Sequence, residues 1–574
     1  MARGNKKLKK KRVKLTPEQR RENAVKRAFY SQVRTVFTRT GFSRIPEAAD
    51  KEFEFENRLG DFDDVFIREN IIICVEYTLS NEAQIGDHVK NKAHLFRLIH
   101  GNRSSFISLL LQRFPAIRGT ISNRFHDNQL RIRIVYCSHF EVKSAHVALT
   151  PETRFMSRAT IQYFKSLAET VRVSARHELF QFLELPFKEI GENGSLPDDL
   201  GEGSFRGSLL PETRSNFPSG YKVVSFYVSP AALLSRAYVL RKDGWRDVDG
   251  LYQRMIDRKK IESIRTHLRQ KERVFVNNVI VTLPAATRLD DLSGNEVSPS
   301  GIDETTPVAV RLPQEANSVG IVDGQHRIFA YYEDIKDDEK ISALRGRQNL
   351  LATGIIYPKD LPTADQSRFE AGLFLEINST QNSAKSDLKQ AIAVITAPYS
   401  ADSIGKRVVS RLGQKGSLEG MLEKHFFDKG VLKTSSMVSF AISHLVRIEG
   451  NESLIRVWQS NDKASVIEKK NDHALAEYVS FCAAELSTFL SAVKANLNDN
   501  QWAIASKDGP GLLSVTSVNS LIILFRKIIF VSGLTDFNGY SSKLKKISEF
   551  EFKAYHSSQY NRMANAILEK VYNK

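Results

Sequence analysis

The chain has 574 residues, enough for three or four domains of about 150 residues each, and it is 41% hydrophobic and 26% charged, as is typical of a globular protein. Its three cysteines are too few for a disulfide framework, and no run of 18 uninterrupted apolar residues predicts a membrane span. The formal net charge of +17 favours a polyanionic partner, because cationic side chains that neutralise phosphates release bound counterions. The alternative is that this charge serves only solubility.

The N-terminus predicts a basic arm followed by a helix. Residues 1–15 are mostly basic or small, which is typical of a disordered arm that lies on nucleic acid. They lack the apolar core of a signal peptide, so we expect the chain in the cytoplasm. A helix should start after Thr16, a candidate N-cap, because Pro17 suits the first helical position and Gln19 completes a capping box.

The rest of residues 16–187 alternates between strand and helix patterns, which predicts an α/β domain. Residues 62–78 predict a hairpin with its turn at Glu69 and Asn70, and the run IIICV is typical of a buried central strand. We expect helices at 82–100 and 159–183, with a strand at 132–138 between them.

Beyond this domain, the composition predicts three further regions. Residues 188–220 are rich in Gly, Pro and Ser, which indicates a linker. Residues 221–394 predict a second α/β domain with a basic helix at 252–270 and with strands at 221–229, 274–283, 319–323, 350–357 and 373–377. Residues 395–574 are mainly helical in pattern, so the fold class is mixed α/β with a helical C-terminal region.

The hairpin carries a pattern found in some metal-dependent nucleases. Such sites hold a divalent cation, for example Mg²⁺, between an Asp on one strand and a Glu on the next, and the cation activates the attacking water. Asp64 and Glu76 have this placement and are the candidate metal ligands. A Lys normally stands two residues after the Glu, but that position is Thr78 here, and its hydroxyl cannot supply the missing cation.

The helix after the hairpin offers a substitute for that lysine. His88 and Lys92 are four residues apart and share a helix face, so Lys92 could reach back to Glu76. The candidate catalytic residues are therefore Asp64, Glu76, Thr78, His88 and Lys92. The alternative is that Asp64 is an ordinary strand-edge residue and Lys92 is solvated.

The segment VGIVDGQHRIFAYYE predicts a strand that leads into a helix through Asp323, Gly324, Gln325, His326 and Arg327. A helix N-terminus suits an anion, Gly324 permits close backbone approach, and Arg327 can bind phosphate in a bidentate manner with His326 as a second donor. We therefore expect a phosphate site for DNA or a nucleoside triphosphate. The alternative is an internal network in which Asp323 caps the helix and Arg327 forms an ion pair.

Two further elements accompany this pentapeptide. The first is the tripeptide Tyr252-Gln253-Arg254 ahead of the basic helix, and with Arg258 and Lys259 it supplies the candidate DNA-backbone contacts, a solvated surface being the alternative. The second is FLEINSTQN, in which the amides of Asn378 and Gln381 could bind polar edges or fix the loop. Ordinary turn chemistry is the alternative for these two residues.

With these three elements in the same order, the chain resembles DGQHR-domain proteins, which include the DndB-like proteins of bacterial DNA phosphorothioation systems. The resemblance covers about residues 220–450. It implies a ParB-like domain, similar to the ParB and sulfiredoxin superfamily, whose loop holds nucleotide phosphates. Gln325 replaces the second His of the kinase-like signature in that superfamily, so the resemblance implies phosphate binding without phosphotransfer. The N-terminal region resembles the PD-(D/E)xK nuclease-like extension of some members.

Together these features predict a DNA-associated protein of a bacterial DNA-modification or phage-defence system. The expected partners are DNA and other proteins of that system, the expected assembly is a homo-dimer, and Mg²⁺ and a nucleoside triphosphate are the candidate cofactors. Three alternatives stay open: a metal-dependent DNA endonuclease gated by the pentapeptide site, a non-catalytic transcriptional regulator, and a nucleotide hydrolase or switch.

Overall fold

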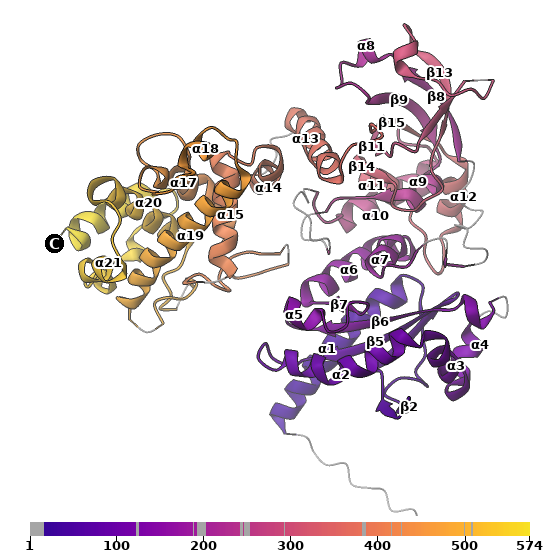
Figure 1. Cartoon of the computed structure of the whole chain (residues 1–574), viewed down its shortest axis with the longest axis horizontal. Coiled ribbons are helices and arrows are strands. Elements are labelled where there is room, and N and C mark those ends of the chain that lie inside the picture. Colours follow the sequence, from indigo (N-terminus) through magenta and orange to yellow (C-terminus); the bar gives the residue numbers. More distant parts are fainter. Residues whose placement is uncertain are drawn as a thin grey trace, which may run out of the picture.

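Helices and strands of mixed α/β type form the first two thirds of the chain, and helices form the rest, as the sequence predicts (Figure 1). The computed structural model describes residues 16–121, 125–186, 189–191, 203–241, 245, 253–291, 293–381, 386–414, 416–425, 427–498, 500–506 and 509–573, without the side chains of 379–381. The predicted basic arm at 1–15 and the predicted contact Tyr252 lie outside these residues.

A five-stranded sheet forms the centre of the N-terminal domain. Its order is β1 (Ser43–Arg44), β4 (Asp64–Arg68), β5 (Ile71–Thr78), β6 (Arg131–Ser138) and β7 (Arg154–Met156). The predicted hairpin is confirmed: β4 and β5 pair antiparallel around the turn at Glu69, whose φ is +52°, and Asn70. Every residue of β5 is buried, because helices cover both faces of this central strand.

Helices α1 (Pro17–Arg39) and α6 (Arg158–Val171) pack on one face of this sheet, and α2 (Ile85–Gly101) and α3 (Arg103–Arg113) pack on the other. The capping box of Thr16 and Gln19 is present. The single helix expected at 159–183 is wrong, because Arg172 takes a φ of +50°. The chain continues there as η2 (Arg172–Ala175) and α7 (Arg176–Phe182).

An eight-stranded sheet forms the centre of the next domain. Its order is β10 (Ala237–Tyr238), β14 (Val319–Asp323), β11 (Val279–Leu283), β15 (Leu350–Ile356), β9 (Lys222–Val228), β8 (Ser204–Leu210), β13 (Thr306–Arg311) and β12 (Arg288–Asp290). Part of the predicted linker 188–220 is therefore a strand. A side chain at Gly207 would collide with the carbonyl of Ser225 on β9, so glycine here serves close strand pairing.

The helices of this domain are α9 (Pro230–Arg236), α10 (Arg258–Lys271), α11 (Gln325–Phe329), α12 (Glu339–Arg347) and α13 (Thr363–Gln381). The predicted strand at 373–377 is wrong, since these residues lie within α13. Its apolar side chains contact two separate clusters, Phe374 with Ile392 and Phe369 with Tyr221, as a helix between two partners requires. The strand expected at 274–283 is confined to its second half, β11.

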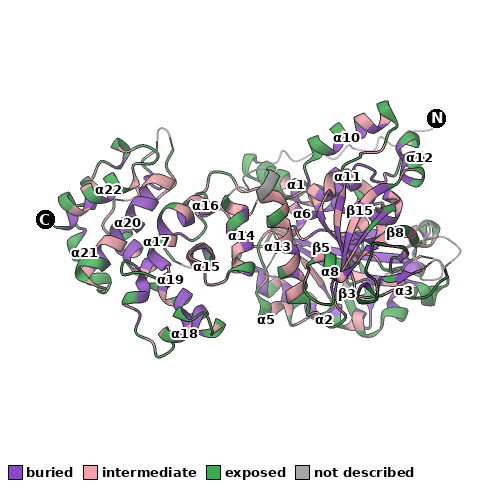
Figure 2. Ribbon diagram, turned by 90° about the horizontal axis from the view of Figure 1, so that it is seen from above, coloured by how far each residue is buried: buried purple, intermediate pink, exposed green. Residues whose placement is uncertain are grey.

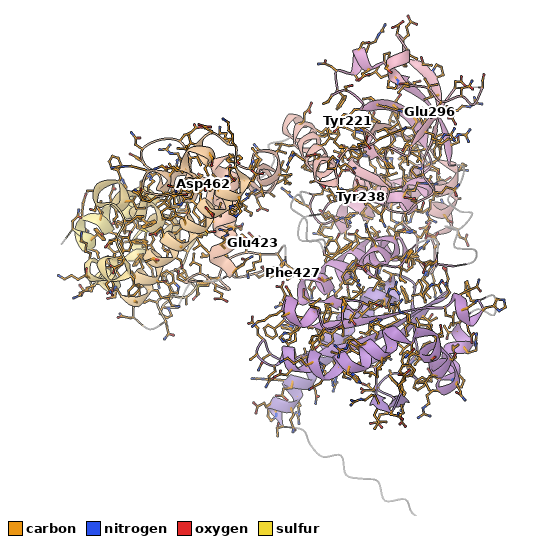
Figure 3. The ribbon with its side chains drawn as sticks, in the orientation of Figure 1. Tyr221, Tyr238, Glu296, Glu423, Phe427 and Asp462 are labelled. Atoms are coloured by element: carbon orange, nitrogen blue, oxygen red, sulfur yellow. The ribbon has the colours of Figure 1, made fainter. Side chains whose placement is uncertain are left out.

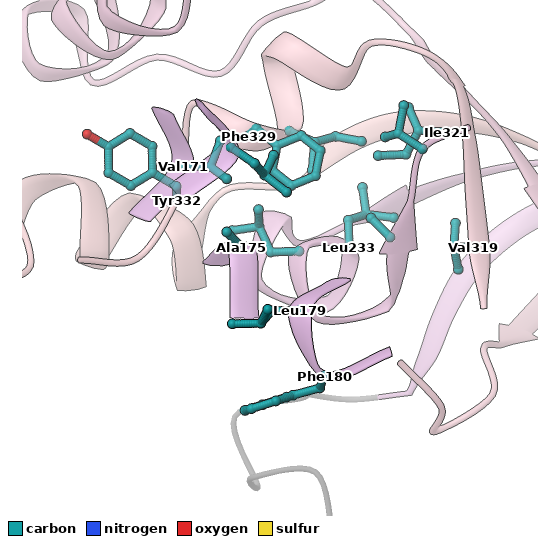
Figure 4. Close-up of a cluster of buried hydrophobic side chains, with 14 of the residues drawn as sticks. Val171, Ala175, Leu179, Phe180, Leu233, Val319, Ile321, Phe329 and Tyr332 are labelled. Atoms are coloured by element: carbon teal, nitrogen blue, oxygen red, sulfur yellow. The ribbon is translucent and has the colours of Figure 1, made fainter. Parts of the chain in front are cut away.

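The two α/β domains share one hydrophobic core. Segments α6, η2 and α7 lie between the two sheets, and their side chains pack against β14 and α11 (Figures 1 and 4). Figure 4 shows Ala175 and Leu179 beside Leu233 and Phe329. The N-terminal domain is therefore fixed on the second domain at the residues that follow the Asp-Gly-Gln-His-Arg pentapeptide.

The C-terminal helices form a second core beside these domains (Figure 2). The longer ones are α14 (Ser386–Thr396), α15 (Ala401–Gln414), α19 (Asp472–Ala495), α20 (Val515–Ser532) and α22 (Tyr560–Ile567). Helix α14 crosses the expected boundary at 394/395 and packs on α13 as well as α15. Among the described helices, α20 alone is long and apolar enough to span a membrane, but most of its side chains are buried in this core.

The domain junction contains a buried ion pair whose loss should be costly. Arg241 donates to Glu178 at 2.8 Å, and Arg241 is fully buried. We expect Arg241→Met to lower the free energy of unfolding by about 3–5 kcal/mol, because it leaves the Glu178 carboxylate buried without this cation. Urea unfolding followed by tryptophan fluorescence measures this loss. The exposed pair of Arg368 and Asp365 gives the control, since Arg368→Met should cost less than about 1 kcal/mol.

Candidate functional site

The carboxyl end of β5 and the first half of α2 bring together three of the predicted catalytic side chains. Lys92 Nζ lies 3.0 Å from the Glu76 carboxylate and 3.0 Å from Asp61 Oδ1. His88 lies 3.8 Å from Glu76 through Nε2, and its Nδ1 is 2.8 Å from the hydroxyl of Tyr136. The expectation that Lys92 reaches back to Glu76 from the helix is confirmed.

Burial dominates the electrostatics of this cluster. It raises the pKa of Glu76 to about 8, against the opposing effect of Lys92. Burial alone would lower the pKa of Lys92, but the neighbouring Glu76 and Asp61 carboxylates outweigh it and raise the pKa. Burial and the charge of Lys92 lower the pKa of His88. The arrangement therefore holds one fixed ammonium beside a carboxyl that can keep or release a proton near neutral pH.

Asp64 does not belong to this cluster, which corrects the predicted metal pair. The hairpin register sets Asp64 opposite Val75, so its side chain lies on the α1 face while Glu76 lies on the α2 face. Asp64 is fully buried, and it accepts hydrogen bonds from Arg34 at 2.7 Å, from the hydroxyl of Tyr77 at 2.8 Å, and from Arg44. These contacts give Asp64 a structural role.

Asp63, and not the predicted ligand Asp64, is the residue that the hairpin register places opposite Glu76. Extending the pairing by one residue sets Asp63 opposite Glu76, and Asp63 accepts from the Tyr77 amide at 2.7 Å and from the Tyr30 hydroxyl at 3.0 Å. Burial raises the pKa of Asp63, partly opposed by the Tyr77 amide. The prediction missed Asp63, although a two-residue turn at 69–70 fixes this pairing from the sequence alone.

The residues present do not fit a divalent metal ion in this arrangement. Within the described residues, no group of three His, Cys, Asp or Glu side chains converges on one point. Instead the Lys92 ammonium lies between Asp61 and Glu76 and donates a hydrogen bond to each of these side chains. The predicted Thr78 is buried and donates to Ser80 at 2.8 Å, which holds the chain after β5.

The pentapeptide forms a tightly bonded connection between β14 and α11. Gly324 has a φ of +98°, which few other residues adopt, and Arg327 pairs with Asp323 at 2.7 Å. His326 accepts the backbone N–H of Asp257 at 3.1 Å, and burial together with Lys260 lowers its pKa to about 4. The imidazole is therefore neutral at physiological pH and joins the loop to the start of α10. Of the alternative internal network, the ion pair of Arg327 is present, whereas the helix cap by Asp323 is absent because the N-cap residue is Gly324.

The elements predicted around the pentapeptide divide into three groups. Gln253 is buried and donates to the carbonyls of Ile321 and Val322, so it supports β14 and cannot contact DNA as expected. The remaining candidates in this segment are exposed: Arg254, Arg258 and Lys259. Asn378 donates to Phe374 O of its own helix at 2.8 Å, which is neither turn chemistry nor a bond to the loop, and the side chain of Gln381 lies outside the described residues.

A buried carboxylate behind β14 was missed by the sequence analysis. Glu370 of α13 accepts hydrogen bonds from Tyr238 at 2.6 Å, Thr282 at 2.5 Å and Tyr357 at 2.6 Å (Tyr238 is labelled in Figure 3). Burial raises the pKa of both tyrosines, with Glu370 adding to the effect. A side chain at Gly320 of β14 would collide with this cluster, so close packing requires glycine at this position. No local sequence signal links these distant positions.

The raised pKa of Glu76 predicts a specific pH dependence. Protonated Glu76 is favoured in the folded state, so its contribution to stability is complete below its ordinary pKa of 4.5 and is lost as the pH rises through about 8. Glu76→Gln should therefore gain stability relative to the wild-type protein as the pH rises across this window, by a few kcal/mol at most. Urea unfolding of both proteins at several pH values measures this. A difference that stays constant with pH would contradict the raised pKa.

Comparison with known proteins gives no family for this chain. No protein-family model, no curated protein and no solved structure matches this chain. The resemblance to DGQHR-domain proteins therefore stays a prediction that rests on three short motifs.

Proposed function

We propose that this chain is a bacterial DNA-binding protein of the DGQHR-domain group, in which a nuclease-like N-terminal domain holds DNA beside the Glu76–Lys92 cluster. It would serve a DNA-modification or phage-defence system in the cytoplasm, together with other proteins of that system and as a homo-dimer. The order of α1, the antiparallel hairpin, α2 and the parallel strand β6 supports the nuclease-like fold.

The observation that carries this proposal is the basic first half of α1. Phe29 is the first buried residue of this 23-residue helix, so the turns before it project from the sheet (Figure 1). They expose Arg20, Arg21, Lys26 and Arg27. Tyr30, on the next turn, bonds Asp63 at the end of the sheet where Glu76 lies. DNA phosphates bound along α1 would therefore pass the Glu76–Lys92 cluster.

A second basic surface supports a separate phosphate contact near the pentapeptide. Arg254, Arg258, Lys259 and Lys260 are exposed around the start of α10, and Asp257 at its N-cap is joined to His326. This surface suits a DNA backbone or a nucleoside triphosphate, whereas Arg327 itself is engaged by Asp323. The pentapeptide would then shape the site through α10 and leave direct contact to the exposed cations.

Neutralising the basic half of α1 tests the proposal directly. We expect a variant with Arg20→Gln, Arg21→Gln, Lys26→Gln and Arg27→Gln to bind a short DNA duplex at least about tenfold more weakly at moderate salt. The log–log salt dependence should lose about 0.9 for each phosphate contact removed. Fluorescence anisotropy across a salt series gives both quantities.

The matched control removes the same charge from connections between the C-terminal helices. It carries four lysine-to-glutamine changes at exposed positions: Lys469, Lys470, Lys545 and Lys546. This variant should bind within about twofold of the wild-type protein, apart from the small effect of net charge. Equal losses in both variants would mean that the charge acts without a defined surface, which would overturn the proposed interface.

The nuclease alternative is favoured by one observation, the proximity of Glu76, Lys92 and Asp61. Because Lys92 bridges the two carboxylates, we expect supercoiled plasmid to be bound but left intact with either Mg²⁺ or EDTA. Agarose-gel analysis of the plasmid measures this, with Glu76→Gln as the comparison. Metal-dependent nicking that disappears in Glu76→Gln would contradict the expectation and assign a catalytic role to the cluster.

A further inference from the structure

A small cavity lies at the other end of the N-terminal sheet, away from the Glu76–Lys92 cluster. Strand β7 begins at Arg154 opposite Val135, so the first residues of β6 have no partner in β7. His100, near the C-terminal end of α2, lies 3.1 Å from the hydroxyl of Thr153, the residue before β7. The cavity measures about 220 Å³ and is lined by His100, Arg103, Arg133, Pro151, Glu152, Arg154 and Glu184.

Three guanidinium groups converge on this cavity, and the fold fixes one of them firmly. Arg133 donates to the carbonyls of Leu183 at 3.0 Å and Glu184 at 2.8 Å, at the end of α7. The two carboxylates that line the cavity lie at its rim, where Glu152 pairs with Arg103 and Glu184 pairs with Arg154. Both glutamates are more than half exposed, at 52% and 63%, so they can turn into solvent without a large burial change.

The three guanidinium charges around the cavity repel one another. Burial lowers the pKa of Arg133, and the charges of Arg103 and Arg154 lower it further. Burial and the same arginines lower the pKa of His100 to about 4, so its imidazole is a neutral hydrogen-bonding group. Arg154 Nε is buried and has no hydrogen-bond partner among the described residues. An anion inside the cavity would relieve this repulsion and accept a hydrogen bond from the free Arg154 N–H.

We propose that this cavity binds a phosphate monoester group, with Arg103, Arg133 and Arg154 as its ligands and with Glu152 and Glu184 occupying the rim until the anion enters. Arginine suits this role because its planar guanidinium donates two parallel bonds to phosphate oxygens. The volume is smaller than the 300–1,000 Å³ of ordinary ligand pockets, so a phosphate group fits better than a whole cofactor.

The phosphate could come from a free nucleotide or from the end of a DNA strand, and binding measurements separate these sources. Isothermal titration of the full-length protein would use inorganic phosphate, deoxyadenosine monophosphate and deoxyadenosine. Anisotropy would compare DNA duplexes with a 5′-phosphate and with a 5′-hydroxyl. We expect inorganic phosphate and the monophosphate to bind and deoxyadenosine to remain unbound, whereas a preference for the phosphorylated duplex would identify a strand end as the source.

Two substitutions should change phosphate affinity in opposite directions. Arg103→Gln should weaken binding by at least about tenfold, because it removes a charged donor. Glu152→Gln should strengthen binding severalfold, because it removes the competing carboxylate, and a gain in affinity cannot come from misfolding. The matched controls are Arg118→Gln and Asp127→Asn, an ion pair of similar exposure elsewhere in the same domain. Both controls should leave the affinity unchanged.

Phosphate binding in the cavity does not depend on the proposed DNA interface, because no residue of α1 lines the cavity and the small-molecule measurements contain no DNA. Absence of phosphate and monophosphate binding to the wild-type protein would overturn it. So would binding that Arg103→Gln and Glu152→Gln leave within about twofold of wild type. Loss of DNA binding in the α1 variant with phosphate affinity retained would support this cavity as an independent site.

Discussion

Strand β5 is buried on both faces along its whole length, and this constraint determines the chemistry of the N-terminal domain. Alternation of side chains along a strand sends Glu76 and Val75 to opposite faces. Because both faces are covered by helices, the Glu76 carboxyl loses its water and its pKa rises, so its ionised form needs a cation from a neighbouring helix. Lys92 supplies that cation from α2, whereas the arginines of α1 and β1 satisfy Asp64 on the other face.

The second constraint is the shared core between the two α/β domains. Helix α7 offers apolar side chains to β14 and α11 on one side, and Glu178 meets Arg241 within the same junction. The backbone of Val173 donates to Glu333 O at 3.1 Å, and Arg176 pairs with the Glu333 carboxylate at 2.5 Å. The N-terminal domain and the segment after the pentapeptide are therefore joined by apolar contacts, hydrogen bonds and ion pairs.

The Asp-Gly-Gln-His-Arg pentapeptide uses most of its polar groups within the protein. Asp323 and Arg327 pair with each other, His326 binds the start of α10, and Gln253 supports the strand before the loop. The motif thus builds a rigid corner that positions α10. Gln253 and the pentapeptide segment, which lie about 70 residues apart in the chain, therefore contact each other in the fold. The structure gives Asn378 no comparable bond to that corner.

Local signals in the sequence were sufficient for the capping box at Thr16, the hairpin turn at Glu69 and Asn70, and the helix that carries Lys92. Each depends on residues close together in the chain, where propensity and spacing act directly. The length of the two-residue turn also fixes the register that makes Asp63 the partner of Glu76. The glycine and serine residues at 203–210 were predicted to belong to a linker, but they form β8. Composition does not reveal that Gly207 permits close contact with β9.

Tertiary structure decided the remaining features. Residues 373–377 have strand-like composition but form a helix, because α13 packs between two apolar clusters, one shared with α14 and one that includes Tyr221. The Glu370 cluster and the arginine-lined cavity likewise join residues from separate elements, and no local pattern marks them. The sequence by itself determined the elements of the hairpin and its flanking helices and the chemistry available, whereas burial on both faces of β5 and the shared domain core determined which charges meet.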